Sequence, residues 1–140
     1  MPVVKQKWIM RTDLKKNPEH LFVFGDNMAR RGLGGQAKEM RGEPNAVGVP
    51  TKWEPSMYPS GFFVEADLEK VRPSIDEAFE RLRAHLARGG TVVLPRDGLG
   101  TGLAQLDGRA PSIAALIQAH IDALDTVTKE EVNDDRAQDT

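Results

Sequence analysis

The sequence predicts a single α/β domain with three layers, α/β/α, in which helices cover both faces of a mixed, mostly parallel sheet. Short apolar runs of strand length alternate with longer segments of helical periodicity, which is the pattern of an α/β layer fold. One run, TVVLP at 91–95, is apolar without interruption, as strands buried on both faces of a parallel sheet are. At 140 residues the chain is long enough for one core and too short for two ordinary domains.

Strands are expected at five places along the chain. Runs rich in β-branched, aromatic and aliphatic residues occupy 5–11 (KQKWIMR), 21–25 (LFVFG), 45–51 (NAVGVPT), 61–66 (GFFVEA) and 91–95. The prolines of KWEPSMYPS, which follows the third run, predict an irregular surface loop.

Three helices are expected between and after these strands. The segment GGQAKEMRG predicts one short helix over 35–42. Over 67–88, apolar residues recur at intervals of three and four, and Pro73 is expected to begin the main part of that helix because proline fits a first turn. A last helix, at about 110–124, has the same apolar spacing.

Composition narrows the classes of function. The chain has no cysteine, which excludes a disulfide framework, a thiolate zinc site and a cysteine nucleophile. No apolar run approaches the roughly 20 residues of a membrane span, and MPVVKQKWIM lacks a secretory signal, so a cytoplasmic protein without a membrane partner is expected. His20, His85 and His120 lack metal-ligand spacing, so neither a metal nor a cofactor is expected.

The last residues differ from the rest of the chain. Residues 125–140 hold six acids and two bases, a charge of −4, which leaves 17 bases and 15 acids, or +2, before them. With almost no apolar side chains, such a segment cannot offset its ordering entropy. A domain over 1–126 is therefore expected, followed by an acidic, disordered tail at 127–140, for which an interaction role is the alternative.

Two glycine-rich stretches follow strand-like runs. FGDNMARRGLGGQA spans Phe24 to Ala37, and LPRDGLGTGLAQLDG spans Leu94 to Gly108. In parallel α/β sheets, ligands bind outside the carboxyl ends of the strands, where both stretches are expected. Glycine lets a ligand approach the main chain closely, so that successive amides can form a cradle for phosphate. Two cradles suit a diphosphate, whereas the alternative is that the glycines only make tight turns.

The stretches supply a set of candidate ligand-binding residues. These are Asp26, Asn27, Gly32, Gly34, Gly35, Gln36, Gly98, Gly100, Thr101 and Gly102. Asp26 and Asn27 could bond ribose hydroxyls or cap the turn, and Thr101 adds a hydroxyl. Neither stretch has Walker A or full Rossmann spacing, which disfavours a GTPase or a Rossmann dehydrogenase. If both stretches serve one ligand, Gly35 and Gly100 must border the same hollow.

These residues resemble the macrodomains, α/β modules that bind ADP-ribose and in several branches remove it from proteins. The resemblance covers roughly residues 5–124 and rests on three stretches. The family's acidic residue looks like the aspartate of RTDL, and its asparagine turn with a glycine loop looks like FGDN followed by GLGGQA. Its second phosphate loop looks like LPRDGLGTGLAQL. The resemblance implies a macrodomain-like fold and ADP-ribose or an ADP-ribosylated substrate as partner. It implies Asp13 for the adenine amine, Asn27 for the distal ribose and as a catalytic candidate, and Gly34 and Gly35 for the diphosphate.

One branch of that family offers a further parallel. VPTKW resembles the lysine-bearing strand end of the branch that cleaves terminal ADP-ribose from carboxylate side chains. The resemblance implies that Lys52 attacks the anomeric carbon of the ribose, which requires a lowered lysine pKa; a solvent lysine is the alternative. That branch has an aspartate where this chain has Ala104, and Asp97, Asp107 and Glu39 are the candidates to replace it.

Three functions follow as hypotheses. Binding of ADP-ribose or a related ADP-ribosyl nucleotide comes first, and an ADP-ribosyl glycohydrolase is the alternative. A nucleic-acid-binding or protein-interaction module is the third, because basic residues beside an aromatic can bind single-stranded nucleic acid. It would use Arg30, Arg31, Lys52, Trp53 and the tail. The sequence leaves the natural ligand and the oligomeric state open.

Overall fold

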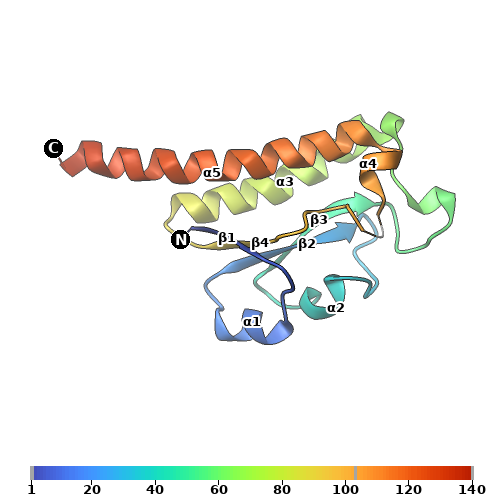
Figure 1. Ribbon diagram of the computed structural model, residues 1–140, viewed down its shortest axis with the longest axis horizontal. Coiled ribbons are helices and arrows are strands. Elements are labelled where there is room, and N and C mark those ends of the chain that lie inside the picture. Colours follow the sequence, from blue (N-terminus) through green and yellow to red (C-terminus); the bar gives the residue numbers. More distant parts are fainter. Residues whose placement is uncertain (1, 103, 140) are drawn as a thin grey trace.

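The protein has three layers, as Figure 1 shows for the computed structural model. The backbone is described for residues 2–102 and 104–139, and the side chains for 2–102 and 104–127. Helices α3 (Leu68–Ala87) and α5 (Pro111–Asp139) cover one face of a central sheet. The shorter α1 (Arg11–Lys16) and α2 (Ala37–Met40) lie on the other face. The predicted α/β/α class is confirmed.

The sheet contains four strands in the order β1-β4-β2-β3. They are β1 (Val3–Gln6), β2 (Leu21–Asn27), β3 (Ala46–Lys52) and β4 (Val92–Pro95). Every neighbouring pair is parallel, so these strands do not form the mixed sheet that the sequence predicted. Within the described residues, antiparallel pairing is limited to an isolated bridge between Lys52 and Phe62. The carboxyl ends of all four strands therefore meet at one edge.

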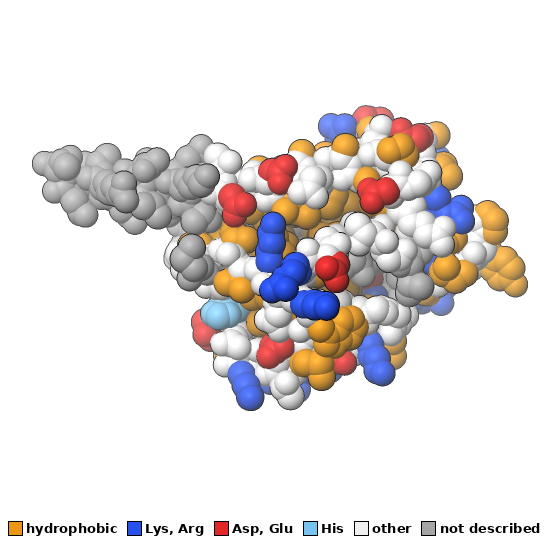
Figure 2. Space-filling view, viewed as in Figure 1, with side chains coloured by type: hydrophobic (Ala, Val, Ile, Leu, Met, Phe, Trp, Pro, Cys, Tyr) orange, Lys and Arg blue, Asp and Glu red, His pale blue; other side chains and the backbone are white. Residues whose placement is uncertain are grey.

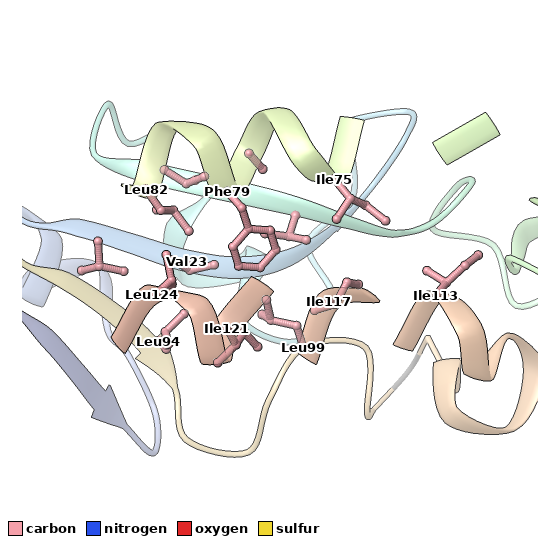
Figure 3. Close-up of a cluster of buried hydrophobic side chains, with 14 of the residues drawn as sticks. Val23, Ile75, Phe79, Leu82, Leu94, Leu99, Ile113, Ile117, Ile121 and Leu124 are labelled. Carbon is pink, nitrogen blue, oxygen red and sulfur yellow. The ribbon is translucent and has the colours of Figure 1, made fainter. Parts of the chain in front are cut away.

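The larger core fills the space between the sheet, α3 and α5. Figure 3 shows Ile75, Phe79 and Leu82 of α3 meeting Ile113, Ile117, Ile121 and Leu124 of α5, with Val23 and Leu94 of the sheet. These are the apolar positions at helical spacing that predicted both helices. Each large apolar side chain that is fully buried stabilises the fold by about 1.5–3 kcal/mol.

A smaller core lies beneath α1 and α2. Its buried members are Ile9, Leu14, Phe22, Phe24, Ala37, Met40 and Val93. Strand β2 contributes to both cores, because successive side chains point to opposite faces: Phe22 and Phe24 face one layer and Leu21 and Val23 the other. Burial on both faces explains the unbroken apolar run from which β2 was predicted.

Three local predictions are wrong. The strand expected at 5–11 ends at Gln6, and α1 begins at Arg11 because the Asp13 carboxylate accepts the Met10 amide at 2.9 Å and caps the first turn. Residues 61–66 belong instead to a connection with two 3-10 helices, Pro59–Gly61 and Glu65–Asp67. Pro73 lies inside α3 rather than at its start, since buried Val71 extends the apolar stripe before the proline.

Helix α5 begins at a polar contact with the second of these 3-10 helices. The Glu65 carboxylate accepts hydrogen bonds from the hydroxyl and the amide of Ser112, at 2.6 and 2.7 Å, and these bonds lower the Glu65 pKa. The backbone of α5 continues into the expected tail, but side chains beyond Val127 lie outside the described residues. The predicted disorder of the tail stays a prediction. No helix in the described ranges is both long and apolar enough to cross a membrane.

Candidate functional site

The carboxyl ends of all four strands border one cavity of about 320 Å³. Its wall includes residues after β1, the end of β2 with the first glycine loop (28–36), the end of β3, and the second glycine loop (96–105). Gly35 and Gly100 both line it, as one shared ligand requires. The volume falls within the range of about 300–1,000 Å³ in which small-molecule sites are found.

The second glycine loop approaches the end of β2, from which the first glycine loop continues. A Cβ atom added to Gly25 would lie 3.8 Å from the Gly100 nitrogen. Gly100 has φ +80°, and a Cβ added to it would lie 2.8 Å from Cδ2 of Leu106. Gly32 has φ +96°, and a Cβ added to it would lie 2.8 Å from Cβ of Pro55. Left-handed backbone and close packing together require glycine at both positions.

Both loops contain backbone amides without a hydrogen-bond acceptor among the described residues. In the first loop these are the N–H groups of Gly32, Leu33, Gly34, Gly35 and Gln36, and in the second those of Leu99, Gly100, Thr101 and Gly102; none donates to an acceptor among the described residues. All of these residues except Leu33 and Thr101 line the cavity. Successive free amides in such loops form concave sites for anions.

The charge around the cavity is positive. Among the described residues, Lys7, Arg31, Arg41 and Lys52 line it together with two carboxylates, Asp26 and Asp97, a formal difference of +2 when Lys52 is protonated and +1 when it is neutral. A cleft with an excess of one charge raises the local concentration of ligands of the opposite charge. The cavity therefore favours anions.

Asp26 organises the first loop and does not face a ligand freely. Its side chain is buried, and Oδ1 lies 2.5 Å from Nη2 of Arg41 while Oδ2 lies 3.2 Å from Nη1 of Arg30. Arg41 also donates to the carbonyls of Gly32 and Arg31, at 2.7 and 3.2 Å. The carboxylate fits because Gly48 has no side chain: a Cβ there would lie 2.8 Å from Cβ of Asp26. One buried ion pair thus holds the loop carbonyls in place.

Asn27 and Gln36 are also engaged by backbone. Asn27 Nδ2 donates to the Arg31 carbonyl at 2.7 Å, and Asn27 Oδ1 accepts a long contact of 3.5 Å from the Arg31 amide. Gln36 Oε1 accepts the Ile9 amide at 2.8 Å, and its Nε2 donates to the Ile9 carbonyl at 2.9 Å. Both residues line the cavity, yet their amide groups shape the loops around it.

Lys52, at the end of β3, also lines the cavity. Its residue is 7% exposed, and Nζ donates to the Ser56 carbonyl at 2.8 Å, lies 3.6 Å from Sδ of Met57 and sits 4.4 Å from the centre of the Phe62 ring. Burial and the nearby positive charge of Arg109 lower the pKa of Lys52, against a smaller opposite effect of Glu54. The solvent lysine that was the alternative is not what is observed.

The loop over Lys52 ends in exposed hydrophobic side chains. Met57 is 54% and Tyr58 77% exposed. Figure 2 shows hydrophobic side chains protruding at the end of the molecule where, in Figure 1, the connection after β3 lies. This apolar surface stands next to the β3 side of the cavity.

Two predicted ligand contacts lie outside the cavity wall. Asp13 caps α1 and accepts from Nε2 of Gln6 at 2.8 Å, so its carboxylate is engaged elsewhere. The Thr101 hydroxyl donates to the Asp97 carbonyl at 2.9 Å, and Thr101 borders a separate hollow between the second loop and α5. The remaining predicted loop residues, together with Lys52, line the one cavity: Asp26, Asn27, Gly32, Gly34, Gly35, Gln36, Gly98, Gly100 and Gly102.

Of the three acids considered in place of the missing aspartate, Asp97 lines the cavity, as Ala104 does. Asp97 also borders the separate hollow, together with Asp107, which does not line the cavity. Glu39 lies outside the cavity wall and accepts the Arg11 amide at 2.9 Å. Among the described residues, no group of three or more histidines and acids could hold a metal ion.

The residues expected to bind nucleic acid, Arg30, Arg31, Lys52 and Trp53, do not form one continuous basic and aromatic surface. Trp53 packs edge-on against Phe63, with ring centres 5.2 Å apart, and its Nε1 donates to Asp67 at 3.0 Å. Arg30 is held by Asp26, whereas Arg31 lies 4.0 Å from Glu54. Trp53 is therefore not free to stack on a base.

Arg41 and Trp8 are among the cavity residues that sequence reasoning missed. Arg41 follows α2 and carried no signal apart from its charge. Trp8 was assigned to the strand at 5–11, but it follows β1, lines the cavity and is 48% exposed. An aromatic two residues after a parallel strand was the signal that could have placed it at the ligand edge.

A model of the family of unknown function DUF7831 matches residues 4–120. The chain belongs to this family. No curated protein and no solved structure matches the chain. In this DUF7831 protein, the matched residues contain both glycine loops, Trp8, Arg41 and Lys52, whereas the acidic tail follows them.

Proposed function

We propose that the protein is a macrodomain-like module that binds ADP-ribose or a related ADP-ribosyl nucleotide. The observation that carries this proposal is that free amides of two separate glycine loops border one cavity with an excess of positive charge. The proposal includes the cytoplasmic location expected from the sequence.

A diphosphate explains this arrangement better than a monophosphate or a neutral ligand does. One run of free amides can hold one phosphate, and here two runs come from loops that follow different strands. Hydrogen bonds from amides to a charged acceptor are stronger than those to a neutral one. A neutral ligand would leave both runs of amides without charged acceptors and would not use the cations on the wall.

Calorimetry with a ligand series tests this proposal. ADP-ribose and ADP are expected to bind at least about tenfold more tightly than AMP, because the second phosphate adds charge-assisted hydrogen bonds of about 1.5–3 kcal/mol each. Adenosine is expected to bind most weakly. Absence of heat with millimolar ADP-ribose in a folded sample, or adenosine binding as tightly as ADP, would contradict the proposal.

Lys52 supports a second candidate function, the hydrolysis of ADP-ribosyl groups from modified carboxylates. A lysine attacks as the neutral amine, and both burial and Arg109 favour that form of Lys52. In the proposed step, Nζ forms a bond to the anomeric carbon, the bond from that carbon to the ester oxygen breaks, and the carboxylate leaves. Water then attacks the same carbon and gives a proton to solvent, the bond from that carbon to Nζ breaks with its electron pair returning to the amine, and ADP-ribose is released.

Removing the amine tests the candidate hydrolase. With an ADP-ribosylated protein as substrate, Lys52→Ala is expected to lower the rate of ADP-ribose release at least about 100-fold, whereas exposed Lys38→Ala leaves it unchanged. Because the neutral amine reacts, the wild-type rate should rise with pH, with its midpoint below the ordinary lysine pKa. Equal release by both variants, while Lys52→Ala still binds ADP-ribose, would remove Lys52 from the mechanism.

A further inference from the structure

We infer that Trp8 stacks on the base of the bound nucleotide, so that the ligand lies with its base at β1, its diphosphate beside β4 and β2, and its distal sugar at β3. This inference rests on the proposed nucleotide binding. It adds which way round the ligand lies and which side chain holds the base.

Trp8 has the exposure and position of a stacking platform. Its side chain lines the cavity, and the residue is 48% exposed although tryptophan is highly buried on average. The other tryptophan, Trp53, packs against Phe63 and the larger core. An indole face accepts any base by stacking, without a hydrogen-bond partner. Asp13, the expected base contact, lies outside the cavity wall with its carboxylate bound to Gln6 and to the Met10 amide.

The segment that carries Trp8 is held on both sides by side chains. Nε2 of Gln6 donates to the Trp8 carbonyl at 3.0 Å. The amide and carbonyl of the next residue, Ile9, both bond to the Gln36 side chain, and buried Ile9 anchors the smaller core. Gln36 itself belongs to the first glycine loop. The backbone that carries the indole is thus fixed relative to the phosphate cradle, which lowers the entropy lost when a ligand binds.

The strand order then fixes the order of the ligand's parts. Across the sheet the strands run β1, β4, β2, β3, and the residues that follow them are Trp8, the second glycine loop, the first glycine loop and the region of Lys52. Because β1 and β3 are the two edge strands of the sheet, Trp8 and Lys52 stand at opposite ends of the cavity, and both glycine loops contribute to its wall. A nucleotide with its base on Trp8 and its diphosphate between the loops directs its distal sugar toward Lys52.

A variant with a single tryptophan tests the inference directly. Trp53→Phe leaves Trp8 as the only tryptophan of the chain, so its fluorescence reports on that indole. We expect saturable quenching with ADP and ADP-ribose and none with inorganic pyrophosphate. By calorimetry, Trp8→Ala should weaken ADP binding about tenfold or more and change pyrophosphate binding less than about twofold, while Trp8→Phe keeps most of the affinity for ADP.

The outcomes separate this inference from the function on which it rests. If wild type binds ADP but Trp8→Ala binds it equally well and Trp8 fluorescence does not respond, the stacking inference is wrong and nucleotide binding stands. An equal loss of ADP and pyrophosphate in Trp8→Ala also overturns it, since that pattern means a disturbed loop. If the wild type binds neither ADP-ribose nor ADP, both proposals are wrong. Circular dichroism checks that each variant is folded.

Discussion

Arg41→Met is expected to lower the free energy of unfolding by about 3–5 kcal/mol, because it leaves the buried Asp26 carboxylate without its main partner. The two side chains meet at 2.5 Å, and Asp26 is 6% exposed. The same change frees the carbonyls of Arg31 and Gly32, so the first glycine loop loses its fixed shape. ADP-ribose binding should therefore fall below detection. Denaturant unfolding and calorimetry measure the two effects.

Arg30 provides the matched control for this prediction. It contacts the same carboxylate at 3.2 Å, but its side chain is 47% exposed, so Arg30→Met should cost less than about 1 kcal/mol. Adding Asp26→Asn to Arg41→Met should recover part of the lost stability, since the unpaired charge is then removed. If Arg41→Met is as stable as Arg30→Met, the buried pair does not hold the loop.

The polar residues of the site were harder to predict than its glycines, because the roles of the polar side chains depend on partners such as Arg41 that are distant in the sequence. Glycines predicted a loop and its place at the end of a strand, which follows from backbone freedom alone. Whether Asp26, Asn27 or Gln36 faces a ligand or the backbone depends on atoms far away in the sequence, such as Arg41 Nη2 and the Ile9 amide. Local sequence contains no such information.

The same division between local and distant causes applies to the fold. The helix over 68–87, the first part of α5 up to Leu124 and the strands around Val23, Val47 and Val93 follow from apolar periodicity, which the two cores use directly. At 5–11, side-chain caps outweighed strand propensity, because Asp13 ties α1 to Met10. At 61–66, Asp67 accepts the Val64 amide at 2.9 Å and favours a helical turn over a strand.

Arg41 and Trp8 are cavity residues that no local sequence pattern assigned to the site. Neither residue belongs to a glycine stretch, and each gains its place in the site only when parallel strands bring their carboxyl ends to one edge. The sequence predicted that edge and two of its loops. It did not predict which side chains from α2 and from the end of β1 would complete the cavity wall.

Gly102→Leu is expected to weaken ADP-ribose binding at least about 100-fold, or about 2.7 kcal/mol, with little effect on stability. Gly102 lines the cavity, and a Cβ added to it would meet no atom within 4 Å. Its φ lies outside the left-handed region, so a side chain brings no backbone strain. The leucine would instead occupy space that the proposal assigns to the diphosphate. Unfolding free energy should change by less than about 0.5 kcal/mol.

Gly108→Leu is the matched control, because an added Cβ also meets nothing within 4 Å there, and Gly108 does not line the cavity. It should bind ADP-ribose as wild type does. Gly100→Leu, in contrast, should lose binding and stability together, since its Cβ would lie 2.8 Å from a Leu106 side-chain atom at φ +80°. Equal affinity of Gly102→Leu and Gly108→Leu would mean that the ligand does not lie between the glycine loops, whatever else it contacts.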